Sequence, residues 1–153
     1  MVAEAPSFEE EKNEAWHAFM QMHELLGARL EQELQASSRL SNADFTILVV
    51  LSESPERRCR VFEMGRIIGW EKSRLHHQLT RMCTRGLVRR EADPDSPRGI
   101  FAVLTDKGYE VIVNAAPSHN DEVQRLFFDK ITEQQVRQLR TISQRVLEDL
   151  LGD

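Results

Sequence analysis

The chain has 153 residues, of which 41% are hydrophobic and 29% charged, with 7 glycines and 5 prolines, so it fits one domain and is not collagen-like, mucin-like or wholly disordered. It lacks an apolar run near the roughly 20 residues that cross a bilayer. Its N-terminus is acidic rather than basic and apolar, which predicts a cytoplasmic protein whose two cysteines are free thiols. The net charge of −5 is unusual for a nucleic-acid-binding protein.

The N-terminal part of the chain predicts two helices. Apolar residues at steps of three and four predict a long amphipathic helix over residues 9–36, which Ser37 and Ser38 interrupt. Ser41 begins the next helix, because Asp44 stands at the third helical position of a capping pattern. Pro55 marks the end of this second helix.

The middle of the chain predicts a helix-turn-helix. Val61–Ile68 forms a short helix, and we place Val61, Met64, Ile67 and Ile68 on its apolar side. Gly69 provides a turn, and Glu71–Arg85 forms the second helix, which ends at Gly86 because glycine tolerates the left-handed backbone found there.

A hairpin and two helices follow. Leu87–Glu91 and Ile100–Leu104 are strand candidates that flank a segment rich in turn residues. Thr105 caps a helix that Pro117 kinks or interrupts, and Thr132 caps the last helix together with Gln135. The predicted fold is mainly α (α+β). A single domain over 1–153 contains a winged helix-turn-helix lobe at 41–108, with a two-stranded wing, between N- and C-terminal helical segments.

Charge is segregated along the chain. Residues 57–98 contain eleven Lys or Arg and five Asp or Glu, a net +6, whereas the remainder has nine against twenty, a net −11. A basic segment between acidic ends is typical of a nucleic-acid-binding lobe on another scaffold. The alternative is an ordinary solvated charged face.

The second helix of the helix-turn-helix has two distinct faces. Leu75, Leu79 and Met82 share one face. Hydrogen-bond donors gather on the other, namely Ser73, Arg74, His77, Thr80, Arg81 and Thr84, and Lys72 lies in the first turn. This donor-rich face suits the acceptors of a DNA major groove, although an ordinary surface helix explains it equally well.

The hairpin favours DNA. Arg98 stands at its tip and Arg89 and Arg90 on its first strand, and an arginine on a protruding tip can enter a minor groove. Alternatively, Arg98 pairs with Asp93 or Asp95 and stiffens the turn, and both roles can coexist.

These residues resemble the MarR family of bacterial transcription regulators. The resemblance rests on Gly69–Leu75, on Arg85-Gly86-Leu87-Val88, on Asp93-Pro94 with Arg98, and on Leu104-Thr105-x-x-Gly108. It implies a homodimer with one winged helix per subunit on a pseudo-palindromic operator. Ser73, Arg74, His77 and Arg81 then face the major groove and Arg98 the minor groove. Ser96 and Pro97 depart from the acidic and basic residues that the family often has before that arginine.

The resemblance and the residues together define the expected DNA-binding set. Its members are Lys72, Ser73, Arg74, His77, Thr80, Arg81, Arg89, Arg90 and Arg98. The apolar stripes of residues 9–36 and 117–151 are more than one small winged helix can cover, so we expect these segments to be dimerisation helices. Packing of the stripes on each other within one subunit is the alternative.

The resemblance also implies a small-molecule effector, often an aromatic acid, in a crevice between the dimerisation helices and the DNA-binding lobe. Trp16, Phe19, His23 and Phe45 are candidates to line it, and all four serve equally well as core residues.

The sequence contains no phosphate-binding glycine loop, nucleophile elbow or metalloprotease motif, so we expect no enzyme, no catalytic residues, no metal and no cofactor. We therefore expect a dimeric, sequence-specific DNA-binding regulator, a ligand-responsive repressor with no membrane contact. The rival hypothesis is a protein-interaction module that uses the winged helix as a dimer scaffold.

Overall fold

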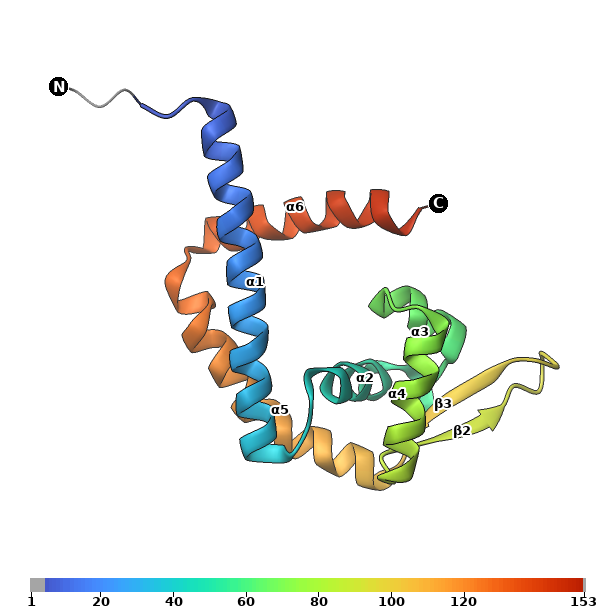
Figure 1. The fold of residues 1–153 in the computed structure, drawn as a ribbon. Helices are drawn as coiled ribbons and strands as arrows, with labels where there is room; N and C mark the ends of the chain where they lie inside the picture. The colour runs from blue at the N-terminus through green and yellow to red at the C-terminus, as the bar shows by residue number, and fades with distance from the viewer. Residues whose placement is uncertain (1–4, 153) are drawn as a thin grey trace.

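The computed structural model describes residues 5–152 and contains six helices and a small antiparallel sheet (Figure 1). The helices are α1 (Phe8–Ser38), α2 (Asn42–Glu53), α3 (Val61–Ile68), α4 (Lys72–Thr84), α5 (Asp106–Leu126) and α6 (Glu133–Leu151). The strands are β1 (Arg58–Arg60), β2 (Val88–Ala92) and β3 (Ile100–Leu104), with 3-10 turns at Pro55–Arg57 and Phe128–Lys130. The fold is therefore mainly helical and includes a winged helix-turn-helix, as predicted.

Helix α1 is longer than predicted at its C-terminal end. Ser7 and Glu10 form a capping box at its start, and the helix continues through Ser37 and Ser38 to a left-handed Arg39. The two serines therefore do not end the helix. It ends at Arg39, whose αL conformation satisfies the last carbonyls, those of Gln35 and Leu34.

Helix α2 begins with the predicted capping box. The Ser41 hydroxyl accepts from the Asp44 amide at 3.0 Å, and the Asp44 carboxylate accepts from the Ser41 amide at 2.9 Å. The next residue, Asn42, donates to the Gly27 carbonyl (2.8 Å) and to the Glu31 carboxylate (3.1 Å). The start of α2 is therefore tied to the side of α1.

Helices α3 and α4 form the predicted helix-turn-helix around Gly69, whose φ of 77° belongs to the left-handed region. Gly86, with φ 74°, follows the end of α4 in the same conformation. The predicted apolar side of α3 is wrong at one position: Val61 and Met64 are buried, but Ile67 is 64% exposed. At about 100° per residue, Ile67 lies roughly 120° from Val61 around the helix, so it falls at the margin of the buried stripe.

The sheet has three strands in the order β1-β3-β2, all antiparallel. Strands β2 and β3 form the predicted wing hairpin, with Val88 opposite Leu104 and Ala92 opposite Ile100. Strand β1 was not predicted, and it pairs Arg58 with Val103 on the other side of β3. A segment of three residues is too short to show the alternation of apolar and polar side chains that predicts a strand. Strand β1 therefore forms only because it pairs with β3.

The two halves of the motif that flanks the wing meet in space. The Thr105 hydroxyl donates to the carbonyls of Gly86 (2.6 Å) and Leu87 (3.0 Å), and it accepts from the Gly108 amide (3.0 Å). A Cβ on residue 108 would lie 2.1 Å from the Leu87 carbonyl oxygen. Glycine is therefore required at position 108 for α5 to start against the end of α4.

Helix α5 runs from the wing along the C-terminal half of α1, where Ser118 donates to the Glu33 carboxylate (2.5 Å). It contains Pro117 without interruption, and Figure 1 shows that it changes direction partway along, as expected where proline removes a backbone hydrogen bond. The predicted segments 41–108 and 117–151 are thus joined by one helix. Thr132 and Gln135 form the predicted capping box of α6.

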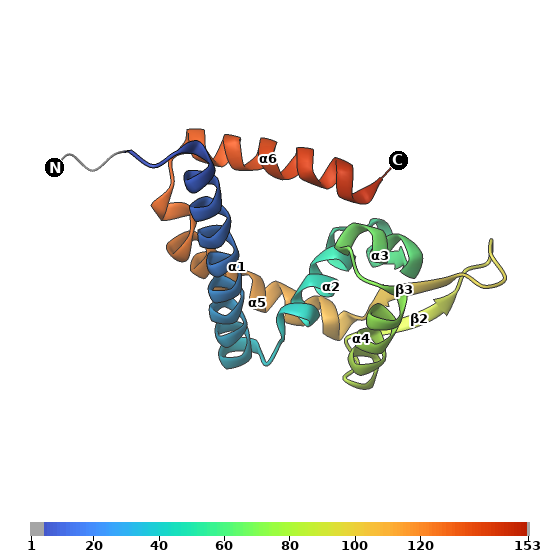
Figure 2. The ribbon, with the colours of Figure 1, turned by 45° about the horizontal axis from the view of Figure 1, so that its top comes forward.

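The hydrophobic core lies between α2, α4, the sheet and the first half of α5. Its fully buried large side chains are Leu34, Leu40, Ile47, Leu48, Leu51, Met64, Leu75, Leu79 and Met82. By contrast, residues 141–151 of α6 and Gly152 after it are all exposed, and Figure 2 shows α6 apart from α2 and α3. Within residues 5–152, none of the helices combines the length and the apolar character that crossing a bilayer requires.

Candidate nucleic-acid interface

Helix α4 presents the predicted donor-rich face to solvent. Leu75, Leu79 and Met82 are buried against the core, which fixes the rotation of the helix about its axis. The exposed residues of α4 include Lys72, Ser73, Arg74, His77, Thr80 and Arg81. The face carries no acidic side chain, so it can approach an acceptor-rich, negatively charged surface without repulsion.

The start of α4 is held by an aromatic contact. The Arg74 guanidinium lies 4.1 Å from the ring centroid of Trp70, which packs partly into the core. A cation over an aromatic face is stabilised by the ring quadrupole. Arg74 is therefore held along the N-terminal turn of α4, where a recognition helix enters a groove.

A pocket with a volume of about 730 Å³ lies between α3, the start of α4 and the wing tip. Its lining includes Arg66, Lys72, His76 and Arg98, together with the exposed ring of Phe62. Burial, followed by the charges of Arg90 and Lys72, lowers the pKa of His76 and so favours its neutral form. The positive potential of the surface therefore comes from arginine and lysine.

The wing tip is organised around Asp93, which is 5% exposed. The Nε atom of Arg60 donates to its carboxylate at 2.7 Å, and the Asp95 amide donates to its other oxygen at 2.9 Å. These bonds hold the pKa of Asp93 below its ordinary range. The sequence offered Asp93 or Asp95 as the partner of Arg98, but Asp93 pairs with Arg60 instead.

Arg98 is therefore exposed at the tip, and no ion pair involving it occurs in the part of the chain from residue 5 to 152. Gly99 follows it where a Cβ would lie 2.9 Å from the Cβ atoms of Asp93 and Ser96, so the tip folds tightly around Asp93. Arg60 and Asp93 take the place of the ion-pair support that Ser96 and Pro97 cannot supply.

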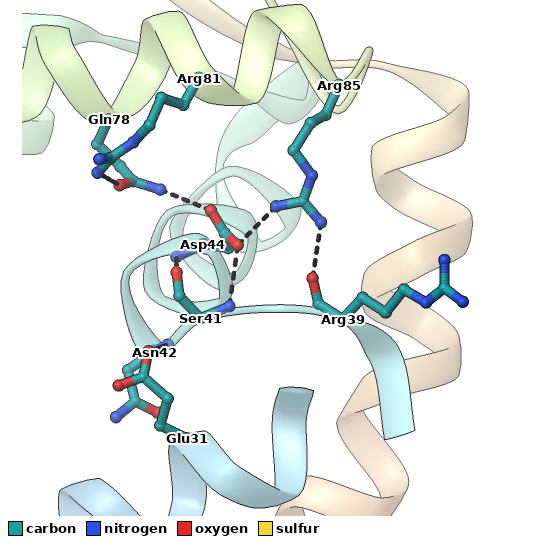
Figure 3. A network of polar contacts seen from close by, with 8 residues as sticks. All are labelled: Glu31, Arg39, Ser41, Asn42, Asp44, Gln78, Arg81 and Arg85. Atoms are coloured by element: carbon teal, nitrogen blue, oxygen red, sulfur yellow. Dashed lines mark hydrogen bonds and ion pairs between the residues drawn. The ribbon is translucent and has the colours of Figure 1, made fainter. Parts of the chain in front are cut away.

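The C-terminal end of α4 is fixed to α2 by a buried carboxylate. One Nη atom of Arg85 donates to Asp44 at 2.7 Å, and the other donates to the Arg39 carbonyl at 2.7 Å (Figure 3). Asp44 is 5% exposed, so the pair is largely shielded from solvent on one side. The angle between α4 and the rest of the lobe is thus set by a charge-assisted contact.

Comparison with known proteins identifies this architecture. No protein-family model matches the chain. The crystal structure of Sco3205 of Streptomyces coelicolor, a MarR family transcriptional regulator in complex with DNA, superposes with a TM-score of 0.91 at 36% identity, over 99% of this chain and 94% of that chain. AbsC, a MarR family transcriptional regulator of the same organism, gives 0.88 at 36% identity, over 99% of this chain and 100% of that chain.

The chain belongs to the MarR family. The transcriptional regulator HosA of Escherichia coli O111:H- is also similar, with 29% identity over 122 residues that span 79% of this chain and 85% of HosA. The protein is therefore a DNA-binding transcription regulator of a non-enzymatic family. The resemblance drawn from the sequence is confirmed.

Some of the residues that the sequence predicts to bind DNA in this MarR-family regulator are bonded to other parts of the lobe. Arg90 is half-buried and donates to the His76 carbonyl (2.8 Å) and the Thr80 hydroxyl (3.1 Å), so it joins β2 to α4. Arg89 pairs with Glu91 at 3.1 Å on the exposed side of the wing.

Sequence reasoning missed Arg60, Asp93 as its partner, and Gln78 in the α4 core face. Arg60 and Asp93 are 33 positions apart, so no local pattern connects them. Gln78 could have been noticed, because it is the polar residue three positions after Leu75 and four before Met82 on an otherwise apolar stripe.

The structure places the four effector candidates on two elements. Trp16 and Phe19 lie next to each other along α1, with tilted rings whose centroids are 5.9 Å apart. Trp16 is 60% and Phe19 46% exposed, and His23 is exposed as well. Phe45 of α2 instead packs on His119 of α5, with the two ring centroids 4.1 Å apart. Within one subunit, Trp16, Phe19 and His23 are therefore not core residues.

Proposed function

We propose that this MarR-family regulator acts as a homodimer that represses transcription from an inverted-repeat operator. The observation that carries the proposal is that the exposed, acid-free face of α4 and the unpaired Arg98 lie on the same basic segment. In this proposal Ser73, Arg74, His77 and Arg81 face the major groove, while Lys72 and Arg89 contact phosphates. Arg98 enters the adjacent minor groove.

Residues 41–108 act as the DNA-binding lobe, and residues 9–36 and 117–151 act as the dimerisation helices. In support, α6 exposes a set of large apolar side chains, namely Ile142, Val146, Leu147, Leu150 and Leu151. A second copy related by a two-fold axis would cover this surface, because each subunit offers the same patch. Such a dimer sets two α4 helices about 34 Å apart, one turn of DNA.

Arg90 and Thr80 have a supporting part in this arrangement. Because Arg90 is bonded to α4, we assign it to holding the wing against the recognition helix, with Thr80 as its partner. A small molecule that changes the distance between the two DNA-binding lobes of the dimer would release the operator. Trp16, Phe19, His23 and Phe45 remain the candidates for contacting it.

The test is selection of bound sequences from random duplexes. We expect an enriched inverted repeat whose half-sites are about ten base pairs apart. Arg98→Ala should weaken binding to all selected sequences by about tenfold, whereas Arg74→Ala and His77→Ala should also change the preferred bases.

Two outcomes separate this function from the rival. If no repeat is enriched and affinity falls little between 50 and 200 mM salt, the winged helix is a protein-interaction scaffold. If affinity falls steeply with salt and a repeat is enriched, the phosphate and base contacts of an operator-binding regulator are present.

A further inference from the structure

A buried amide lies behind the DNA-facing side of α4. Gln78 is 3% exposed and lies among Leu75, Leu79 and Met82 on the core side of the helix. Its Nε2 atom donates to Asp44 of α2 at 2.6 Å (Figure 3). An unpaired amide at this depth would cost free energy, so its contact with Asp44 fixes where its side chain can lie.

The contacts of Asp44 fix the orientation of that amide. One carboxylate oxygen of Asp44 accepts from Gln78, and the other accepts from Arg85 at 2.7 Å and from the Ser41 amide at 2.9 Å. Because a carboxylate only accepts, the NH₂ group of Gln78 must face it. The carbonyl oxygen of Gln78 therefore points the other way.

That oxygen reaches the exposed face of the recognition helix. Oε1 of Gln78 accepts from Nη2 of Arg81, one turn further along α4. Arg81 itself is exposed, so its remaining N–H groups face solvent. A guanidinium presents five donors in a rigid plane, and a bond at one edge restricts the direction of that plane.

We propose that Gln78 is a specificity-determining positioning residue, which orients the Arg81 guanidinium for a bidentate contact with the major-groove edge of a guanine. The proposal rests on the proposed function, in which Arg81 faces the major groove. Arginine discriminates guanine when both N–H groups of one edge reach O6 and N7 together, and a side chain already held in that direction loses less entropy on binding. Asp44 in turn positions Gln78.

The experiment compares base preferences of the full-length protein and three variants by selection from random duplexes. Arg81→Ala identifies the base pair that Arg81 reads. Gln78→Met keeps the volume and apolar packing of the side chain but removes both hydrogen bonds. We expect Gln78→Met to reduce discrimination at that same base pair by about tenfold. The double variant Gln78→Met/Arg81→Ala should discriminate there little less than Arg81→Ala does alone.

Two controls separate positioning from stability. Ile47→Val removes one methyl group from the fully buried side of α2 without touching Asp44, so it should lower stability and leave every base preference unchanged. Gln78→Glu can keep both bonds only as a neutral carboxyl, whose O–H donates to Asp44 and whose carbonyl oxygen accepts from Arg81, because two carboxylates at this distance repel each other. We expect it to keep the discrimination at low pH and to lose it as the carboxyl ionises, so it tests the same contact if Gln78→Met does not fold.

The outcomes are distinct. If Arg81→Ala relaxes one base pair and Gln78→Met does not, the positioning role is overturned while operator recognition by α4 stands. If Gln78→Met weakens binding to all sequences equally, as a destabilised core would, the role is also overturned. If Arg81→Ala changes no base preference, the proposed contact of Arg81 fails, and the inference fails with it.

Discussion

The winged-helix lobe (residues 41–108) and the helical frame (residues 9–36 and 117–151) have similar apolar periodicity but very different burial. In the lobe, Ile47, Leu48 and Leu79 are 0% exposed. In the frame, Trp16 is 60% and Leu150 75% exposed, and Leu34, near the end of α1 that meets the lobe, is the one buried side chain of these two segments. The comparison shows that spacing predicts which side chains share a face, whereas what covers that face depends on the rest of the assembly.

Polar groups follow the same division. The buried polar residues of the described chain, Asp44, Gln78 and Asp93, all belong to the lobe and are hydrogen-bonded within it. The lobe therefore satisfies its own interior. The frame offers an apolar surface that a single subunit leaves open, which is the state expected of a helix pair built to meet a second copy.

The largest expected effect tests the lobe core. Leu48→Ala should lower the free energy of unfolding by about 3 kcal/mol, because it leaves a cavity among fully buried side chains. Leu150→Ala, the matched change in the frame, should cost about 0.5 kcal/mol or less in a dilute, monomeric sample. Urea unfolding measures both values, and equal losses would contradict the division between the two regions.

The next effect tests the frame as a dimer surface. Ile142→Glu should raise the dimer dissociation constant by about a hundredfold, because the interface would bury an unpaired carboxylate from each subunit. Thr141→Glu is the control, since residue 141 lies on the side of α6 away from the apolar stripe. Sedimentation equilibrium gives the constants. A wild-type protein that stays monomeric at micromolar concentration would refute the dimer.

A smaller effect concerns the wing. Asp93→Asn weakens the Arg60 contact that anchors the tip, so affinity for the selected operator should fall by about tenfold through Arg98. The variant that combines Asp93→Asn with Arg98→Ala should bind no worse than Arg98→Ala alone. Asp95→Asn is the matched control, because Asp95 is exposed. Fluorescence anisotropy at fixed salt measures these affinities, and additive losses would show that Asp93 acts separately from Arg98.

The smallest effect is a pH dependence of the folding stability, which arises where the lobe contacts the frame. Burial lowers the pKa of His119, and Glu33 opposes this shift. The unfolded chain therefore binds the proton more readily, so the stability from the neutral ring is complete above pH 6.5 and declines as the pH falls toward the folded pKa. His119→Phe should reduce the loss of stability between pH 7.5 and 5.5.

His77→Asn is the control for that measurement, because His77 is exposed. His76 also has a lowered pKa, so part of the dependence should persist in His119→Phe. Urea unfolding at the two pH values gives the comparison. An unchanged slope in His119→Phe would assign the dependence to other groups.

Local rules predicted most elements of the fold. The capping boxes at Ser41 and Thr132, and Gly69 and Gly86 at the helix ends, act within four residues of each boundary, so the boundaries were close. Strand β1 escaped prediction because three residues form a strand only through β3. The end of α1 was misplaced because the conformation of Arg39, rather than the serines, terminates it.

The candidate interface divides in the same way. The two faces of α4 follow from helical spacing, and the basic segment follows from counting charges. The restraints on the individual arginines did not follow, because Arg60 with Asp93 and Arg85 with Asp44 are contacts between residues 33 and 41 positions apart. Such contacts form only when α2, α4 and the sheet have packed.

By itself, the sequence determined the order of helices, the wing, the family and the donor-rich face of α4, because caps, turns and periodicity act over a few residues. Among the described residues, tertiary structure alone decided which basic side chains of the lobe lack an ion pair, as Arg98 does, and which are held by another element, as Arg90 is by α4. It also decided that the apolar face of α6 is left exposed. A side chain's partners depend on the packing of distant elements, and no local pattern encodes that.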